Sequence, residues 1–215
     1  MYSVSKNIKE KQIKSKKRVV EHGEVFTAER EVNAMLDLVE PVISGIDTTV
    51  LEPAVGEGAY LIQILKRRLD TISAYHISDR AKQWQILKAV SSLYGVDIQA
   101  DNVAICRNKL KDCVCRYLKQ EDIQLEKGFI KGLNEILKRN VVCGNTLSAK
   151  TSDNSDLTFS EWHFEPDGRI YRMEYTYREL LDKGGECTAK RRRHTYSWMV
   201  DHDSPVRAAM ELENV

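Results

Sequence analysis

The chain lacks several features that would assign it to a special class of protein. Nowhere in its 215 residues does an apolar run approach the roughly 20 residues that a membrane span needs. The lysine-rich beginning lacks the apolar segment that a signal peptide carries. We therefore predict a soluble protein of the cytoplasm with no membrane partner.

Cysteine is scarce and its spacing is uninformative. The chain has five cysteines, an odd number, and none of them forms a Cys-x-x-Cys pair. No histidines lie near them at the spacing of metal ligands. Reduced thiols are expected, because the cytoplasm keeps cysteine reduced. A metal site is not predicted. The cysteines are Cys106, Cys113, Cys115, Cys143 and Cys187.

Charge is balanced over the whole chain but not locally. There are 33 lysines and arginines against 32 aspartates and glutamates. Basic residues nevertheless crowd positions 6–18, and a second basic block runs from Lys190 to His194. Either block could contact nucleic-acid phosphates, and either could be a solvated flexible arm.

Between these blocks, hydrophobic spacing predicts helices that alternate with short strands. Such alternation is typical of a parallel sheet covered on both faces, so the predicted fold class is α/β and Rossmann-like. Pro41 is expected to close the first helix, and Asp101 to cap the fourth. The predicted helices cover residues 29–39, 59–69, 80–93, the segment after Asp101, and 121–138, and the predicted strands cover 48–51, 94–98 and 141–145.

The last third of the chain changes character. Residues 157–164 and 169–177 are rich in aromatic and β-prone residues, and Pro166-Asp167-Gly168 between them predicts a β-hairpin. The predicted organisation is a basic arm at 1–19, a cofactor-binding domain at 20–150, the hairpin at 151–180, and a basic, flexible tail at 181–215.

An apolar strand runs into a glycine turn between Leu51 and Tyr60, where a helix is predicted to begin. Gly56 and Gly58 permit positive φ and close approach of a ligand, and the helix start offers free N–H groups. A nucleotide-like cofactor site is predicted, although the same glycines could serve only a tight turn. Dinucleotide binding is disfavoured, because Leu61 replaces the third glycine of that fingerprint.

Four segments in order resemble the cofactor half of adenine-N6 DNA methyltransferases of restriction-modification systems. The resemblance covers about residues 20–150 and rests on Gly23 to Thr27, Glu52 to Gly58, Gly95 to Ile98, and Gly144 to Leu147. It implies S-adenosylmethionine as the cofactor and DNA as a partner.

The resemblance also implies a role for each matching residue. Phe26 and Thr27 would hold the methionine end of the cofactor, and Asp97 would take the ribose hydroxyls. Asp97 could instead be a helix N-cap, and the asparagine after Gly144 could be ordinary turn chemistry. The turn residues expected around the methionine and ribose are Glu52, Pro53, Ala54, Gly56 and Gly58, and those expected at the adenine are Ile98 and Asn145.

One segment that the family normally has is missing. In these enzymes an Asn-Pro-Pro-Tyr-like segment holds a flipped adenine, but none of the four prolines here follows an asparagine or another proline. We therefore expect the cofactor-binding part of a truncated or split methyltransferase, whose partner chain carries the catalytic and target-recognition parts. The alternatives are a noncatalytic adaptor of methyltransferase fold, and a methyltransferase of another substrate class with groups near Glu161 or His163.

Overall fold

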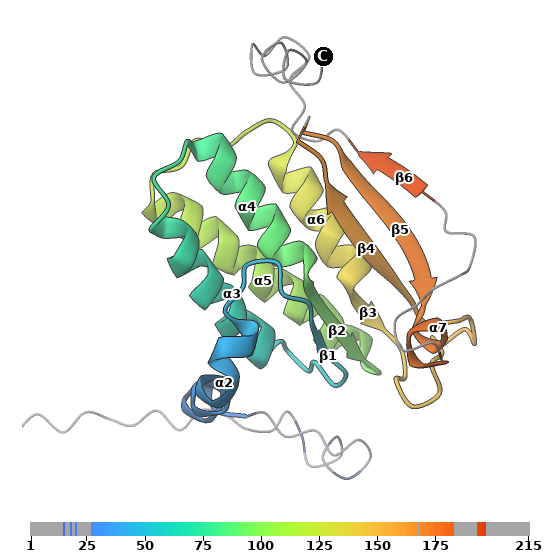
Figure 1. The fold of residues 1–215 in the computed structure, drawn as a ribbon. Helices are drawn as coiled ribbons and strands as arrows, with labels where there is room; N and C mark the ends of the chain where they lie inside the picture. Colours follow the sequence, from blue (N-terminus) through green and yellow to red (C-terminus); the bar gives the residue numbers. More distant parts are fainter. Residues whose placement is uncertain are drawn as a thin grey trace, which may run out of the picture.

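The computed structural model describes residues 15, 18, 20, 27–166, 168–182 and 193–196. It contains a parallel sheet with strand order β1-β2-β3 and an antiparallel sheet with order β4-β5-β6 (Figure 1). In chain order the elements are α2 (Glu29–Ile43), β1 (Val50–Glu52), α3 (Ala59–Ser73), α4 (Asp79–Ser91), β2 (Leu93–Asp97), α5 (Ala100–Gln120), α6 (Phe129–Asn140), β3 (Val141–Cys143), β4 (Thr158–Phe164), β5 (Ile170–Thr176), α7 (Tyr177–Asp182) and β6 (Arg193–Tyr196).

The parallel sheet is built from two successive crossovers, each with two helices between its strands: α3 and α4 join β1 to β2, and α5 and α6 join β2 to β3. Val50 of β1 lies beside Leu93 of β2, and Gly95 of β2 lies beside Val141 of β3. Both crossovers step in the same direction, so right-handed connections place α3 and α5 on the same face of the sheet. This arrangement confirms a mixed α/β fold with a parallel sheet flanked by helices.

A buried arginine fixes α3 to the beginning of the sheet. Arg68 is 1% exposed, and its guanidinium donates to the carbonyl oxygens of Thr48 and Ala89 and to Ser92 Oγ. Burial lowers the pKa of Arg68 to about 10, against an opposing effect from Asp47. The three acceptors give hydrogen-bond partners to both terminal nitrogens of this buried cation, while its Nε has none among the described residues.

The other face of the parallel sheet is covered by the hairpin of β4 and β5. Tyr94 and Val96 of β2 point to this face and form a small core with Leu157 and Phe159. The rings of Tyr94 and Phe159 meet edge to face at a centroid distance of 5.8 Å. The predicted hairpin is therefore present, and it packs against the parallel sheet.

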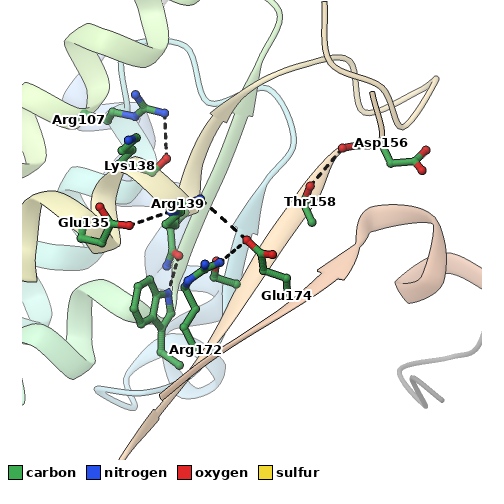
Figure 2. Close-up of polar contacts among 11 residues, drawn as sticks. Arg107, Glu135, Lys138, Arg139, Asp156, Thr158, Arg172 and Glu174 are labelled. Carbon is green, nitrogen blue, oxygen red and sulfur yellow. Dashed lines mark hydrogen bonds and ion pairs between the residues drawn. The ribbon is translucent and has the colours of Figure 1, made fainter. Parts of the chain in front are cut away.

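Polar contacts also tie this hairpin to α6 (Figure 2). Asn140, at the end of α6, is fully buried and accepts a hydrogen bond of 2.7 Å from Trp162 Nε1 of β4. Arg139 lies between Glu135 of α6, at 2.9 Å, and Glu174 of β5, at 3.9 Å. Glu174 in turn pairs with the buried Arg172.

Several element boundaries differ from those that the spacing predicts. Helix α2 continues past Pro41 to Ile43, because only its last turn follows the proline and few bonds are lost. Residues 121–128 are not helical, and α6 begins after Gly128, whose φ is +92°. Within the range predicted as a tail, Arg193–Tyr196 forms β6 beside β5.

Candidate functional site

The three parallel strands bring the predicted site residues to one edge of the sheet. β1 ends at Glu52, β2 ends at Asp97 and β3 ends at Cys143, and Glu52 and Cys143 lie in the strands on either side of β2. Ligands of open α/β sheets bind outside the carboxyl ends of the strands. The edge formed by these three strand ends is therefore the candidate site.

The glycine turn connects β1 to α3 with two residues at positive φ. Gly56 has a φ of +52°, and Gly58, the N-cap of α3, has a φ of +89°. Gly58 also lies against α5, since a Cβ built there would stand 2.6 Å from Cys106 Sγ. A structural requirement thus accounts for Gly58 without any ligand.

Asp97 joins the glycine turn to the start of α5. Its Oδ2 accepts a hydrogen bond of 2.9 Å from the backbone N–H of Gly56, 41 positions earlier in the chain. Its Oδ1 accepts from the N–H of Gln99 at 2.7 Å and from Asn102 Nδ2 at 3.4 Å. Two residues proposed for one cofactor from separate segments are therefore in direct contact.

The predicted capping roles at α5 are replaced by another arrangement. Gln99 is the N-cap and its side chain makes no capping bond, so neither Asp97 nor Asp101 is the N-cap residue. Asp101 lies in the first turn and pairs with Arg18 at 2.7 and 3.2 Å. Asp97 instead bonds the N–H two residues on, a local turn that aspartate forms readily.

Exposed apolar groups flank Asp97. Ile98 is 50% exposed, and Pro53 and Ala54 in the glycine turn are also exposed. Glu52 is partly buried and accepts a hydrogen bond of 3.2 Å from the N–H of Ala54. The edge therefore presents a fixed carboxylate beside apolar surface.

Asn145 occupies the loop after β3 and stabilises a turn. Its side-chain oxygen accepts hydrogen bonds from the N–H groups of Leu147 and Ser148, at 2.9 and 3.3 Å. The next residue, Thr146, donates to the carbonyl oxygen of Pro53 at 3.4 Å, so this loop reaches the glycine turn. Leu147, the last residue of the fourth motif segment, is 97% exposed.

The structure says less about Phe26 and Thr27, the residues predicted to hold the methionine end of the cofactor. Thr27 is partly buried and immediately precedes Ala28, the N-cap of α2. Phe26 lies outside the described residues, as do most of the two basic blocks. Thr27 makes no described hydrogen bond to the glycine turn or to Asp97.

The aromatic residues of the hairpin serve mainly as core. Tyr175 and Tyr177 pack against Phe159, with ring centroids 6.3 and 5.6 Å apart. Glu161 and His163 are about 40% exposed and lie together, with His163 Nε2 3.3 Å from Glu161 Oε1.

Two further classes of site receive no support from the described residues. They contain no group of three histidine, cysteine, aspartate or glutamate side chains placed to hold a metal ion. No helix in the described ranges is long and apolar enough to cross a membrane.

Comparisons with protein families, with curated proteins and with solved structures found no match for this chain. The candidate site therefore stands on its own geometry and on the four sequence segments.

Proposed function

We propose that this chain is the S-adenosylmethionine-binding portion of a site-specific DNA adenine-N6 methyltransferase. The observation that carries the proposal is the hydrogen bond between the Gly56 N–H and the Asp97 carboxylate, at the carboxyl ends of neighbouring parallel strands. The sequence segments propose these two residues separately for the same cofactor.

The chemistry of the edge suits this ligand. A ribose diol needs hydrogen-bond acceptors, and a carboxylate offers about four lone-pair positions. At Asp97, three donors already use some of these positions. Ile98 and Ala54 offer apolar surface for the adenine, and the first N–H groups of α3 offer donors for the methionine carboxylate. When bound, the cofactor would supply an activated methyl group.

Asp97 would adjust when a diol binds. Its carboxylate holds the Gly56 N–H and the start of α5 together, so a diol would share or displace one of these donors. The weakest described contact is the 3.4 Å bond from Asn102 Nδ2, and it is the one that we expect to lengthen.

The proposal assigns no catalytic residue to this chain. The segment after β3 forms a loop and then enters the antiparallel sheet, and no Asn-Pro-Pro-Tyr segment occurs in the sequence. Presentation of the target adenine and recognition of the DNA sequence would come from elsewhere. A partner chain that carries both parts therefore belongs to the proposed function.

Calorimetric titration with S-adenosylmethionine tests the proposal. We expect the unmodified chain to bind, and Asp97→Asn to weaken binding by about 10-fold or more, since a bond to a charged acceptor is worth roughly 1.5–3 kcal/mol. Asp112→Asn on the exposed side of α5 is the matched control and should bind normally. Thermal melts of both variants check folding.

Two outcomes would contradict the proposal. One is the absence of any heat of binding for the unmodified chain at millimolar cofactor. The other is equal affinity for the chain and a folded Asp97→Asn variant, which would mean that the cofactor binds away from this edge.

A further inference from the structure

Helix α2 exposes an apolar stripe in addition to the side that it buries. Val32 and Leu36 are buried against the core. On another side of the helix, residues spaced three and four apart expose large apolar side chains. A helix side that faces solvent normally carries polar residues. The α2 stripe consists of Met35, Leu38, Val39 and Val42, which are 52%, 83%, 44% and 71% exposed.

The neighbouring strand β1 is an edge of the parallel sheet. Among the described residues, β2 is the only strand beside it. The N–H of Val50 donates to the carbonyl oxygen of Ser92, so the alternation of a parallel ladder directs the N–H and C=O of Leu51 away from β2. Parallel strands are usually buried within a sheet, and an open edge accepts another strand.

The stripe and the edge lie close enough for one segment to cover both. Only residues 44–49 separate α2 from β1, and Ile43 and Val50 pack against the same core. Near the middle of α2, Tyr60 Oη donates to Met35 Sδ at 2.8 Å, and Tyr60 lies in the first turn of α3, just after the glycine turn. Figure 1 shows α2 beside α3.

Charge decides between a second copy and a different protein as the occupant. Positions 29–52 contain six carboxylates and one arginine. Two of the carboxylates, Glu29 and Asp37, pair with Lys66 and Arg67 of α3. The remaining acidic excess disfavours a second copy that docks through this same face, which would bring the same charge, and favours a basic partner segment.

We propose that the α2 stripe and the open edge of β1 together bind a basic, apolar segment of another polypeptide, which adds a parallel strand beside β1. Main-chain bonds to Leu51 would fix the strand, and apolar side chains would cover the stripe. The inference goes beyond the cofactor proposal and does not depend on it. An added strand would also extend the sheet edge that carries the candidate site.

Selection from a phage library of random peptides, each of about 12 residues, tests the proposal with the full chain and no cofactor, since about 12 residues accommodate one strand and its flanks. We expect the recovered peptides to share alternating apolar residues flanked by lysine or arginine, and to bind more weakly as salt rises. The double substitution Leu38→Asp and Val42→Asp should weaken binding by about 10-fold or more.

The matched control places two aspartates on exposed apolar residues elsewhere. Tyr75 and Ile77 are 37% and 40% exposed in the connection between α3 and α4, and Tyr75→Asp with Ile77→Asp should leave binding unchanged. Circular dichroism establishes that both double variants are folded. Hydrogen exchange adds a second readout, because a strand beside β1 should slow exchange of the Leu51 amide in the complex.

Three results would overturn the proposal. Recovered peptides that bind the stripe variant as well as the unmodified chain would place the contact elsewhere. Unchanged exchange at Leu51 would exclude the added strand. Light scattering that shows a dimer of the chain alone, abolished by the stripe variant, would assign the surface to a second copy.

Discussion

Replacing Asn140 with alanine should strongly destabilise the fold. The side chain is fully buried, and it joins the end of α6 to the parallel sheet and to the hairpin. Its Nδ2 donates to the carbonyl oxygens of Ser91 and Leu93, at 2.7 and 3.1 Å, and its Oδ1 accepts from Trp162 Nε1 at 2.7 Å. One substitution therefore removes the partners of three groups.

The expected magnitude follows from the groups that are left behind. A buried polar group without a partner costs about 1–3 kcal/mol, and a carbonyl that keeps another bond costs less. We expect Asn140→Ala to lower the free energy of unfolding by about 3–5 kcal/mol, a large share of the roughly 5–15 kcal/mol that a domain has. Trp162→Phe removes the indole N–H and leaves a smaller buried ring, so it should cost at least about 1–2 kcal/mol.

Urea unfolding followed by circular dichroism measures these changes independently of the indole signal. Asn108→Ala, on the exposed side of α5, is the matched control and should change stability by less than about 0.5 kcal/mol. The variant with both Asn140→Ala and Trp162→Phe should cost less than the sum of the single changes, because the two share one bond. A cost below about 1 kcal/mol for Asn140→Ala would refute the reasoning.

Four further predictions concern the glycine turn, the buried thiol beside it and the reaction. Gly58→Ala should lower the free energy of unfolding in urea by about 2–4 kcal/mol, because alanine would be strained at this positive φ and would overlap Cys106. Adding Cys106→Ala should relieve only the overlap, and full recovery of stability would contradict the backbone strain. Burial raises the pKa of Cys106 from 9.0 to about 12, so stability should fall as pH rises from about 9 to 12, where only the unfolded thiol ionises, and this slope should flatten in Cys106→Ala. Mass spectrometry after brief iodoacetamide treatment at pH 8.5 should find the partly exposed Cys115 alkylated before Cys106, and the reverse order would contradict the buried state. Radiolabelled methyl transfer to unmethylated DNA should be undetectable with this chain alone, and measurable transfer would contradict the missing catalytic segment.

Hydrophobic spacing predicts the order of elements well because it records which side of each element is buried. The parallel strands at β1, β2 and β3 and the hairpin of β4 and β5 are found where the sequence places them, within a few residues. The helix predicted over 121–138 is shorter, since Gly128 takes a left-handed conformation that stops it from extending back to Glu121. The role of Arg68 could not be predicted, because its three acceptors come from two other segments, before β1 and at the end of α4.

The residues of the candidate site could be predicted in part, and their contacts could not. The motif segments identify Gly56 and Asp97, but their contact depends on how β1 and β2 pair, which spacing alone does not specify. Asn145 is a motif residue whose observed contacts are those of a turn. Its hydrogen bonds to Leu147 and Ser148 match the turn role that the sequence allowed as an alternative. A motif asparagine in such a turn needs evidence of a ligand before it counts as a binding residue.

The two glycines of the turn carry different weight for the cofactor proposal. Gly58 packs against Cys106 and would be needed in a protein that binds nothing, so its presence says little about function. The Gly56 N–H, by contrast, contacts a carboxylate at a sheet edge that also exposes Pro53, Ala54 and Ile98. Apolar residues left exposed beside a fixed charged group add nothing to the core, whereas a ribose with its adenine would use both. The functional argument for this turn therefore rests on Gly56 and Asp97, and the substitution that tests it is Asp97→Asn.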